Sequence, residues 1–393
     1  GKNIQKRMSI LSMVQLNALK GSSESREEYV MEIKKLSPES IFPVVASKSL
    51  NAPKGYKELW AEFKNSGFVE YNLYKDGFLW LESLDGVLLE YLSCQPVLTA
   101  ADSDAVGVSL YDQIKTAAAL AACLVCDDIN DEKPFLLIKT DFWRVQDFIF
   151  SGGANTNKGA AKVLRGRSLM VSLISECAAL RVLKNLDLSP ANLLINVAGQ
   201  SLILAPNNQN NKNKLKCIEK RFYKWSFEKT VGKSGVSLAW VEATKGEIAD
   251  FSQGLDKVGL ALERAKLQKF NLLSGDEIHE DCFDDLFNKL KETNNNGLCP
   301  INSDLPGETG NVDIYKTPEE EANESDGKPE ADGGKSESGF KNLASLSFDQ
   351  VLAGKMATSG EINVVKFSDY SKSLPLNESD ILNRKNNRKL ICD

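Results

Sequence analysis

The sequence predicts an α/β (α+β) protein built on a ferredoxin-like βαββαβ domain, with a helical region before it and a partly disordered insertion after it. A short apolar run at 135–140 ends at Asp141, and two further runs, 192–197 and 201–205, are joined through a glycine-containing turn. A long helical pattern lies between the first run and the second. One strand, one helix and a tight hairpin in this order form the first half of a split βαβ fold.

Residues 1–107 are expected to form a helical region before this domain. Apolar residues recur at helical spacing over 56–63 and again over 78–92, and a turn signal at 75–77 separates the two patterns. Neither pattern brings candidate catalytic or metal-binding side chains together, so we expect these helices to serve packing.

The most regular helical pattern, 108–126, opens the domain that we place at 108–272. Ser109 is expected to cap this helix, with Asp112 three positions further on as in a capping box. The alanines that follow would allow the helix to approach a neighbouring sheet closely.

The continuation completes a βαββαβ order with a trailing helix. Residues 208–230 are polar and basic with apolar residues at helical spacing, 235–243 alternate as a strand does, and 247–272 form another amphipathic helical pattern. The ferredoxin-like core is therefore predicted at about 133–272.

The apolar pattern is lost after this domain. We interpret 273–342 as an insertion or linker, in which 317–339 is rich in acidic residues, Gly, Pro and Ser and is expected to be disordered. Order is expected to resume at 343–365, as a helical turn and then a short strand, and 343–393 is interpreted as the start of a further segment.

Eight cysteines are scattered along the chain and are typical of buried thiols in a reducing cytoplasm. Cys123 and Cys126 form a Cys-x-x-Cys pair, which is compatible with redox chemistry or with half of a zinc site. Because no second pair accompanies it on this apolar helix, we favour buried packing.

Composition excludes several classes of function. A net charge of −6 argues against a chain that binds nucleic acid unaided, because such binding depends on Lys and Arg neutralising phosphates. The single histidine, His279, excludes multi-histidine metal sites and leaves little room for Ser-His-Asp chemistry. No run is long and apolar enough to cross a membrane, and we expect a cytoplasmic protein.

Asp141 stands where nucleotidyl transferases of this fold hold a metal-binding carboxylate. Two-metal catalysis needs carboxylates from separate strands, but the hairpin turn, 197–201, contains no acidic residue. We therefore expect this domain to be catalytically silent. The structural alternative is that Asp141 only caps the following helix.

Arg165, Arg167 and Ser168 open the long helix after a glycine-rich loop, 152–159. Guanidinium groups and free amides at a helix N-terminus suit a phosphate or an RNA backbone. The alternative is a pair of surface arginines that bond the loop and neighbouring carboxylates. The loop is no P-loop, since it lacks the Gly-Lys-[Ser/Thr] ending.

The helix expected at 208–230 carries a basic face interleaved with aromatic residues. It could contact RNA or an acidic protein partner, or it could be a solvated helix face. The cations are Lys212, Lys214, Lys216, Lys220, Arg221 and Lys224.

Three groups of motifs resemble one family. They are SLYDQIKTAAALAACL (109–124), DFWRVQDFIF (141–150) followed by LRGRS (164–168), and NLLINVAGQSLILA (192–205). Together, in this order and at this spacing, they are similar to motifs of the large, polymerase-like subunit of type III CRISPR effector complexes, closest to the Csm branch. The resemblance covers residues 56–272 well and the remainder loosely.

The resemblance implies a parent protein with an HD nuclease, a first palm, a zinc-binding insertion, a second palm with a GGDD signature and a helical C-terminal domain. Such proteins cut single-stranded DNA, and they make cyclic oligoadenylates from ATP with a divalent metal, Mg²⁺ or Mn²⁺. Implied partners are guide RNA, the other subunits and the second palm. This chain resembles the first palm with the helical region before it.

The chain also departs from the family pattern. It holds no His-Asp pair and no GGDD, since Gly333-Gly334 is followed by Lys335. Cys299-Pro300 lacks the second cysteine of the zinc motif, so no zinc is expected. Trp143 and Arg144 stand where the family has small residues, and Gln113 replaces a common histidine.

From the motif positions, Asp141, Gln146 and Phe148 are expected to frame the core of the palm. Arg165, Arg167 and Ser168 would face the partner palm or a phosphate, and Gly199 and Gln200 would form the degenerate turn. No catalytic residue is expected, and Asp141 is the one candidate metal ligand.

The function expected is that of a non-catalytic nucleotide-binding or docking domain. Two alternatives stay open. One is a stand-alone cyclase-like nucleotidyltransferase whose second carboxylate comes from Asp147 or Glu176, and the other is a protein that acts purely as a scaffold.

Overall fold

The computed structural model describes residues 29–45, 52–65, 77–97, 107–151 and 160–268, and a few positions beyond them: 288, 299, 302, 305, 311–312 and 340–341. Most of the predicted insertion lies outside the described residues, apart from single positions and the short antiparallel pair β7 (Asn311–Val312) and β8 (Phe340–Lys341). The whole of 343–393 also lies outside them. The chain divides into two compact units. One holds 1–129 with 187–194 and 204–206, and the other holds the rest.

The first unit contains helices and one short antiparallel strand pair. Its elements are β1 (Tyr29–Val30), β2 (Val44–Val45), α1 (Ala52–Asn65), α2 (Gly77–Leu92) and α3 (Leu110–Leu124). Ile33, Leu59 and Tyr91 form a small buried cluster of apolar side chains. The helical periodicity seen over 56–63 and 78–92 thus serves packing between these elements.

Helix α3 is fixed at its start as the sequence predicts. The Ser109 hydroxyl accepts a hydrogen bond from the Asp112 amide at 3.0 Å. The Tyr111 hydroxyl donates to Asp85 at 2.9 Å, and the Lys115 ammonium lies 3.1 Å from the same carboxylate. The Tyr and Lys of the SLYD-type motif therefore attach α3 to α2.

Cys123 is fully buried, while Cys126 is exposed. The Asn192 side-chain amide lies 3.7 Å from the Cys123 sulfur. Burial raises the pKa of the Cys123 thiol to about 12, which keeps it protonated and unreactive at neutral pH. Packing, as favoured from the sequence, is the role that this environment supports for Cys123.

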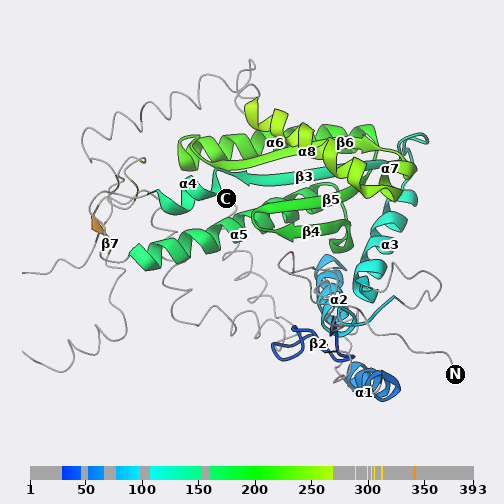
Figure 1. Ribbon diagram of the computed structural model, residues 1–393. Helices are drawn as coiled ribbons and strands as arrows, with labels where there is room; N and C mark the ends of the chain where they lie inside the picture. The colour runs from blue at the N-terminus through cyan, green and yellow to red at the C-terminus, as the bar shows by residue number, and fades with distance from the viewer. Residues whose placement is uncertain are drawn as a thin grey trace, which may run out of the picture. The chain divides into compact units, whose positions relative to one another are not determined.

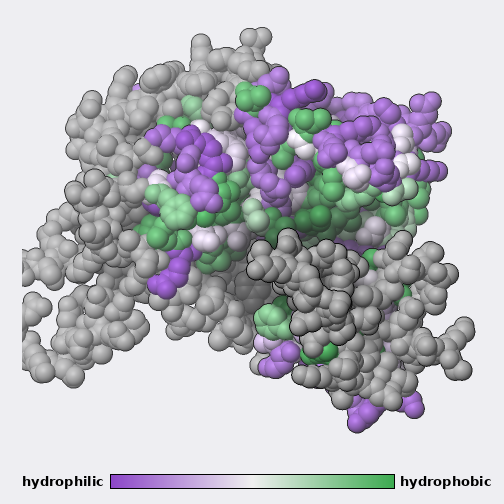
Figure 2. All heavy atoms as spheres, in the orientation of Figure 1, coloured by the Kyte–Doolittle hydropathy of each residue, from purple (hydrophilic) through white to green (hydrophobic). Residues whose placement is uncertain are grey.

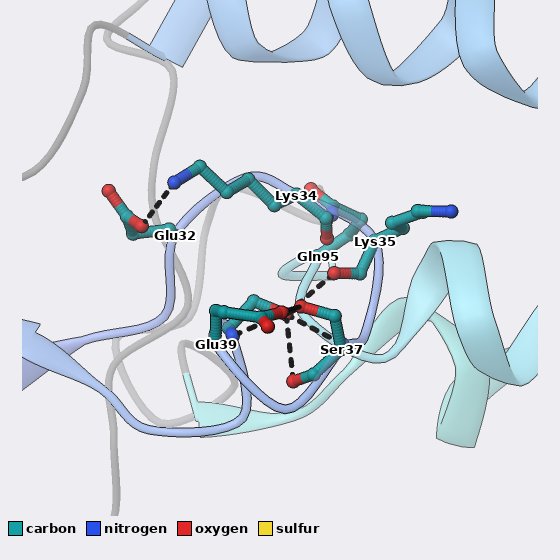
Figure 3. Close-up of polar contacts among 7 residues, drawn as sticks. Glu32, Lys34, Lys35, Ser37, Glu39 and Gln95 are labelled. Carbon is teal, nitrogen blue, oxygen red and sulfur yellow. Dashed lines mark hydrogen bonds and ion pairs between the residues drawn. The ribbon is translucent and has the colours of Figure 1, made fainter.

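The loop after β1 is held by a compact hydrogen-bond network (Figure 3). The buried Ser40 hydroxyl donates to the Lys35 carbonyl at 2.6 Å and accepts from the Ser37 amide at 2.8 Å. The Gln95 side chain donates to the Lys34 carbonyl at 3.3 Å. These side-chain bonds supply partners for backbone groups of the loop that are not paired in a sheet. The role of the network is therefore to stabilise the loop.

The ferredoxin-like palm is confirmed. Its elements in chain order are β3 (Phe135–Trp143), α4 (Val145–Phe150), α5 (Ala160–Asn185), the 3₁₀ turn η5 (Pro190–Asn192), β4 (Leu193–Val197), β5 (Gln200–Pro206), α6 (Gln209–Thr230), β6 (Gly235–Ala243), α7 (Lys245–Ala249) and α8 (Phe251–Leu267). The sheet order is β4-β5-β3-β6, and Figure 1 shows these strands side by side. Strands β3 and β6 pair antiparallel from Phe135 opposite Ala243 to Trp143 opposite Gly235.

Helices cover both faces of this sheet, which explains why β3 is apolar along nearly its whole length. Leu137 points to the face covered by α8, where a Cβ on Gly254 would lie only 2.7 Å from the Leu137 side chain. Phe142 points to the opposite face and packs edge-to-face on Phe148, with ring centroids 5.0 Å apart. Val236, the strand partner of Phe142, lies there beneath α5 and α6.

The hairpin between β4 and β5 turns through two residues with positive φ, Ala198 at 54° and Gly199 at 85°. This is the signature of a type I′ turn, whose twist matches that of the flanking strands. The prediction that Gln200 forms part of the turn together with Gly199 is therefore wrong, because Ala198 and Gly199 make the turn and Gln200 is the first residue of β5.

Among the described residues, no helix has the length and apolarity that a membrane span needs.

Candidate functional site at the palm edge

The predicted site residues gather at one end of the sheet, which we call the palm edge: the end of β3, the β4–β5 turn, the start of β6, helix α4 and the first turns of α5. The Phe142 amide donates to the Gly199 carbonyl at 2.9 Å, which ties the turn to the end of β3. Trp143 lies opposite Gly235 at the start of β6. The antiparallel order thus brings segments distant in the sequence to one edge.

Asp141 is 6% exposed, and its carboxylate lies 2.7 Å from the Lys266 ammonium of α8. The same ammonium lies 2.8 Å from Glu263. Burial lowers the pKa of Lys266, but hydrogen bonds to Asp141 and Glu263 outweigh this and raise it. Lys266 is therefore charged at neutral pH and supplies the cation that a buried carboxylate requires.

The alternative that Asp141 caps the next helix is not what the structure shows. Asp141 lies inside β3, and the residue at the N-cap of α4 is Arg144, which makes no side-chain capping bond. Sequence reasoning missed Lys266, although a signal existed. Lys266 follows Gly254, Val258 and Leu262 at four-residue spacing, so a lysine continues the buried stripe of α8.

Arg144 and Asp147 form a second ion pair at the palm edge. Arg144 is in the left-handed region at φ 59°, and its Nε lies 2.5 Å from the Asp147 carboxylate. Both side chains are more than half exposed. Of the other α4 residues, Gln146 is exposed and Phe148 is buried against Phe142, so only Phe148 belongs to the core.

The prediction that Arg165 and Arg167 open the long helix is wrong, because α5 begins at Ala160 and both lie inside it, where their amides are no longer free N-terminal donors. The two arginines also lie in different environments. Arg167 is 2% exposed and donates from Nη1 to the carbonyls of Ile149, at 3.0 Å, and Ser151. Burial lowers the pKa of its guanidinium. Arg165 and Ser168 are exposed. Arg167 thus attaches the end of α4 to α5, and the other two remain open to a ligand.

Gly199 is buried and closely surrounded. A Cβ there would lie 3.4 Å from Val171 of α5 and 3.6 Å from Phe142. Its positive φ is also one that glycine adopts at little cost. Gln200 is exposed beside it. The degenerate turn therefore packs closely against both β3 and α5.

A small cavity of about 120 Å³ opens at the palm edge. Arg144, Asp147 and Ser151 line one side, and Thr230, Lys233 and Ser234 line the other. Sites that enclose small organic ligands usually measure about 300–1,000 Å³. The palm edge alone is too small to enclose a nucleotide, so further walls would be needed.

The carboxylates present do not fit the two-metal site that the fold implies. Asp141 already bonds Lys266, and Asp147 already bonds Arg144. Glu176, the other carboxylate that the nucleotidyltransferase hypothesis invokes, is half-buried on α5. Within the described ranges, no group of three or more His, Cys, Asp or Glu residues is placed to hold a metal ion.

Comparisons with known proteins agree with this architecture. Residues 134–282 match the family model "Csm1 subunit domain B". The single-strand-specific deoxyribonuclease Cas10/Csm1 (subtype III-A) of Thermococcus onnurineus is 27% identical over 205 residues, 48% of this chain and 26% of that protein. Its counterpart from Mycobacterium tuberculosis is 32% identical over 167 residues, 38% of this chain and 20% of that protein.

Solved structures give the same result. A Csm1–Csm4 cassette in complex with one ATP matches 63% of this chain and 34% of its own chain, at 25% identity and a TM-score of 0.50. A Csm1–Csm4 cassette in complex with cA4 matches 64% of this chain and 34% of its own, at 24% identity and a TM-score of 0.51. The chain spans about a quarter of the length of the curated relatives it matches. The predicted resemblance to the Csm-branch large subunit is confirmed over the palm.

Proposed function

We propose that this chain, whose palm is related to domain B of Csm1, is part of the large subunit of a type III CRISPR effector complex, and that its palm binds or docks against nucleotide without catalysing transfer. The observation that carries the second half of this proposal is the Asp141–Lys266 pair. A carboxylate held by a lysine at 2.7 Å has its charge compensated and offers little to a metal ion.

The size of the palm edge supports a shared site. Its cavity of about 120 Å³ holds less than a nucleotide, and Arg165, Ser168 and Gln200 on α5 and β5 are exposed. A second palm of the same parent protein would supply the missing walls. The ATP-bound relative supports ATP as the nucleotide.

Other Csm subunits and guide RNA are the partners proposed for the assembled protein. The structural neighbours are Csm1–Csm4 cassettes, which supports a Csm subunit as one of them. We place this assembly in the cytoplasm. The proposed domain limits are 1–107 for the helical region, 108–272 for the first palm, 273–342 for the insertion and 343–393 for the start of the next segment.

The test of catalytic silence is incubation of the full chain with labelled ATP and Mn²⁺, followed by separation of any oligoadenylate. We expect no product above background. Product that disappears in Asp141→Asn but persists in Lys139→Gln, a change at a neighbouring strand position, would instead establish the nucleotidyltransferase hypothesis.

The test of assembly is expression of the tagged chain in cells that carry a type III locus without its own large subunit. We expect guide RNAs and other subunits to co-purify. A well-folded chain that recovers no guide RNA would contradict docking by this region.

A further inference from the structure

We propose that the groove between α5 and α6, on the face of the sheet that these two helices cover, binds a segment of single-stranded DNA. The groove has a volume of about 210 Å³, and its lining shares no residue with the cavity at the palm edge, although Val236 belongs to the start of β6. Val236, Ala178 and Phe222 form part of its apolar floor and walls. This volume is large enough for one planar ring but too small to enclose a drug-sized ligand.

The rim of the groove is positively charged. Arg181 of α5 and Arg221 and Lys224 of α6 line it, and Glu228 is the one carboxylate among the described lining residues. Glu228 lies 3.7 Å from Lys224, so that pair compensates itself. Within the described part of the chain, Arg221 makes no ion pair. The groove therefore offers the Arg221 guanidinium group to an anion.

The positive charge continues along α6 beyond the groove. Lys216 and Lys220 are exposed and precede Lys224 at four-residue spacing, so the three side chains form one stripe. Figure 2 shows hydrophilic side chains gathered in the region where Figure 1 places α6 and α8. A stripe of this kind follows a chain of phosphates, whereas one small anion would need only the groove.

Trp225 gives the groove an aromatic wall. It lines the groove and is half-buried, so part of its ring stays accessible. A base can stack on an indole only if its own face is free, and a paired and stacked duplex base has no free face. Cations beside an accessible ring are typical of single-strand binding and distinguish it from binding to an acidic peptide.

The choice of DNA rests on the proposed function, because the curated relatives are named as single-strand-specific deoxyribonucleases. A chain with a net charge of −6 repels nucleic acid elsewhere, which concentrates binding on this local patch. The face covered by α5 and α6 would then guide a single strand along the subunit while the palm edge serves nucleotide.

The test is fluorescence anisotropy of labelled dT12 with the full chain at several salt concentrations. We expect Arg221→Glu with Lys224→Glu to weaken binding at least tenfold. The slope of log affinity against log salt should fall by about 1.4, at about 0.7 per lost phosphate contact for single strands. We expect Trp225→Leu to weaken binding about tenfold and Trp225→Phe to retain most of it.

The matched control is Arg264→Glu with Lys245→Glu, which reverses the same two residue types at exposed positions on α8 and α7. We expect less than a twofold change. Circular dichroism of each variant distinguishes lost binding from lost folding, and Trp225→Phe keeps the test decisive if Trp225→Leu unfolds.

Several results would overturn the proposal. They are no binding of dT12, equal losses in the groove and control variants, rU12 binding more than tenfold tighter than dT12, or displacement of dT12 by polyglutamate at lower concentration than by unlabelled dT12. None of these outcomes bears on ATP turnover or guide-RNA docking, so a failure here is distinguishable from a failure of the proposed function.

Discussion

The palm edge and the α5–α6 groove both gather charged side chains, but the charge of the groove is compensated from within only in part. At the palm edge Asp141 meets Lys266, and Asp147 meets Arg144. In the groove Lys224 meets Glu228, whereas Arg221 makes no ion pair within the described part of the chain. Internal compensation favours a stable, chemically quiet structure, whereas uncompensated charge favours an external partner. On a palm whose metal site is degenerate, a charged ligand is therefore expected at the groove, where charge stays unpaired, and not at the Asp141–Lys266 pair.

The largest effect is expected from Lys266→Met, which breaks the internal compensation. Asp141 would stay buried without its cation, and we expect the free energy of unfolding to fall by about 2–3 kcal/mol. The control is Lys257→Met on the same helix, whose pair with Glu247 has a lysine 53% exposed and should contribute at most about 1 kcal/mol. Urea unfolding measures both, and equal losses would remove the contrast between buried and exposed pairs.

A smaller effect concerns Glu219 of α6, a partly buried carboxylate that forms no ion pair with the residues the structure describes. Glu219 lies 3.4 Å from the Tyr223 hydroxyl, and burial raises its pKa to about 7. The folded state therefore holds this proton more tightly than the unfolded state, whose pKa is near 4.5. Stability should fall as pH rises from 4.5 to 7, by about 1 kcal/mol because solvent screens this partly exposed group, with more of the fall above pH 5.

Glu219→Gln should flatten this part of the pH profile, because the amide does not titrate. Urea midpoints measured at pH 5, 6, 7 and 8 check it. Glu228→Gln, which removes an exposed carboxylate from the same helix, is the control and should leave the profile unchanged. A parental profile that rises between pH 5 and 7 and is unaffected by Glu219→Gln would show that Glu219 is not the buried acid described.

The smallest effect is expected from neutralising the groove. Arg221→Gln with Lys224→Gln removes only exposed cations, and stability should change by less than about 0.5 kcal/mol. Thermal unfolding measures it. A loss above about 1 kcal/mol would mean that these cations stabilise the fold, and the contrast with Lys266 would then disappear.

Much of the fold could be predicted because its signals are local. Asn208 was placed at the start of the helix that runs to Thr230, and its side chain caps α6 by accepting from the Asn211 amide at 2.8 Å. The strand predicted at 135–140 continues to Trp143, because β6 offers pairing partners as far as Gly235. Strand length is therefore decided by the partner, which lies about a hundred residues away.

The helix predicted at 247–272 was wrong at its start. Thr244 and Glu247 form a capping box at the start of α7. The helix is interrupted at Asp250, and α8 begins at Phe251. The capping-box spacing was present in the sequence. The break was hidden, since amphipathic spacing continues across it.

The sequence by itself determined the order of strands and helices, the glycine at the hairpin turn and the lack of acidic residues there. These follow from periodicity and from φ preferences, which act over a few residues. Only the tertiary structure decided that Lys266 holds Asp141, that Arg167 points inward while Arg165 stays exposed, and that α5 and α6 share a basic groove. The reason is physical: burial and ion pairing depend on distances between segments far apart in the chain, and local spacing carries little information about them.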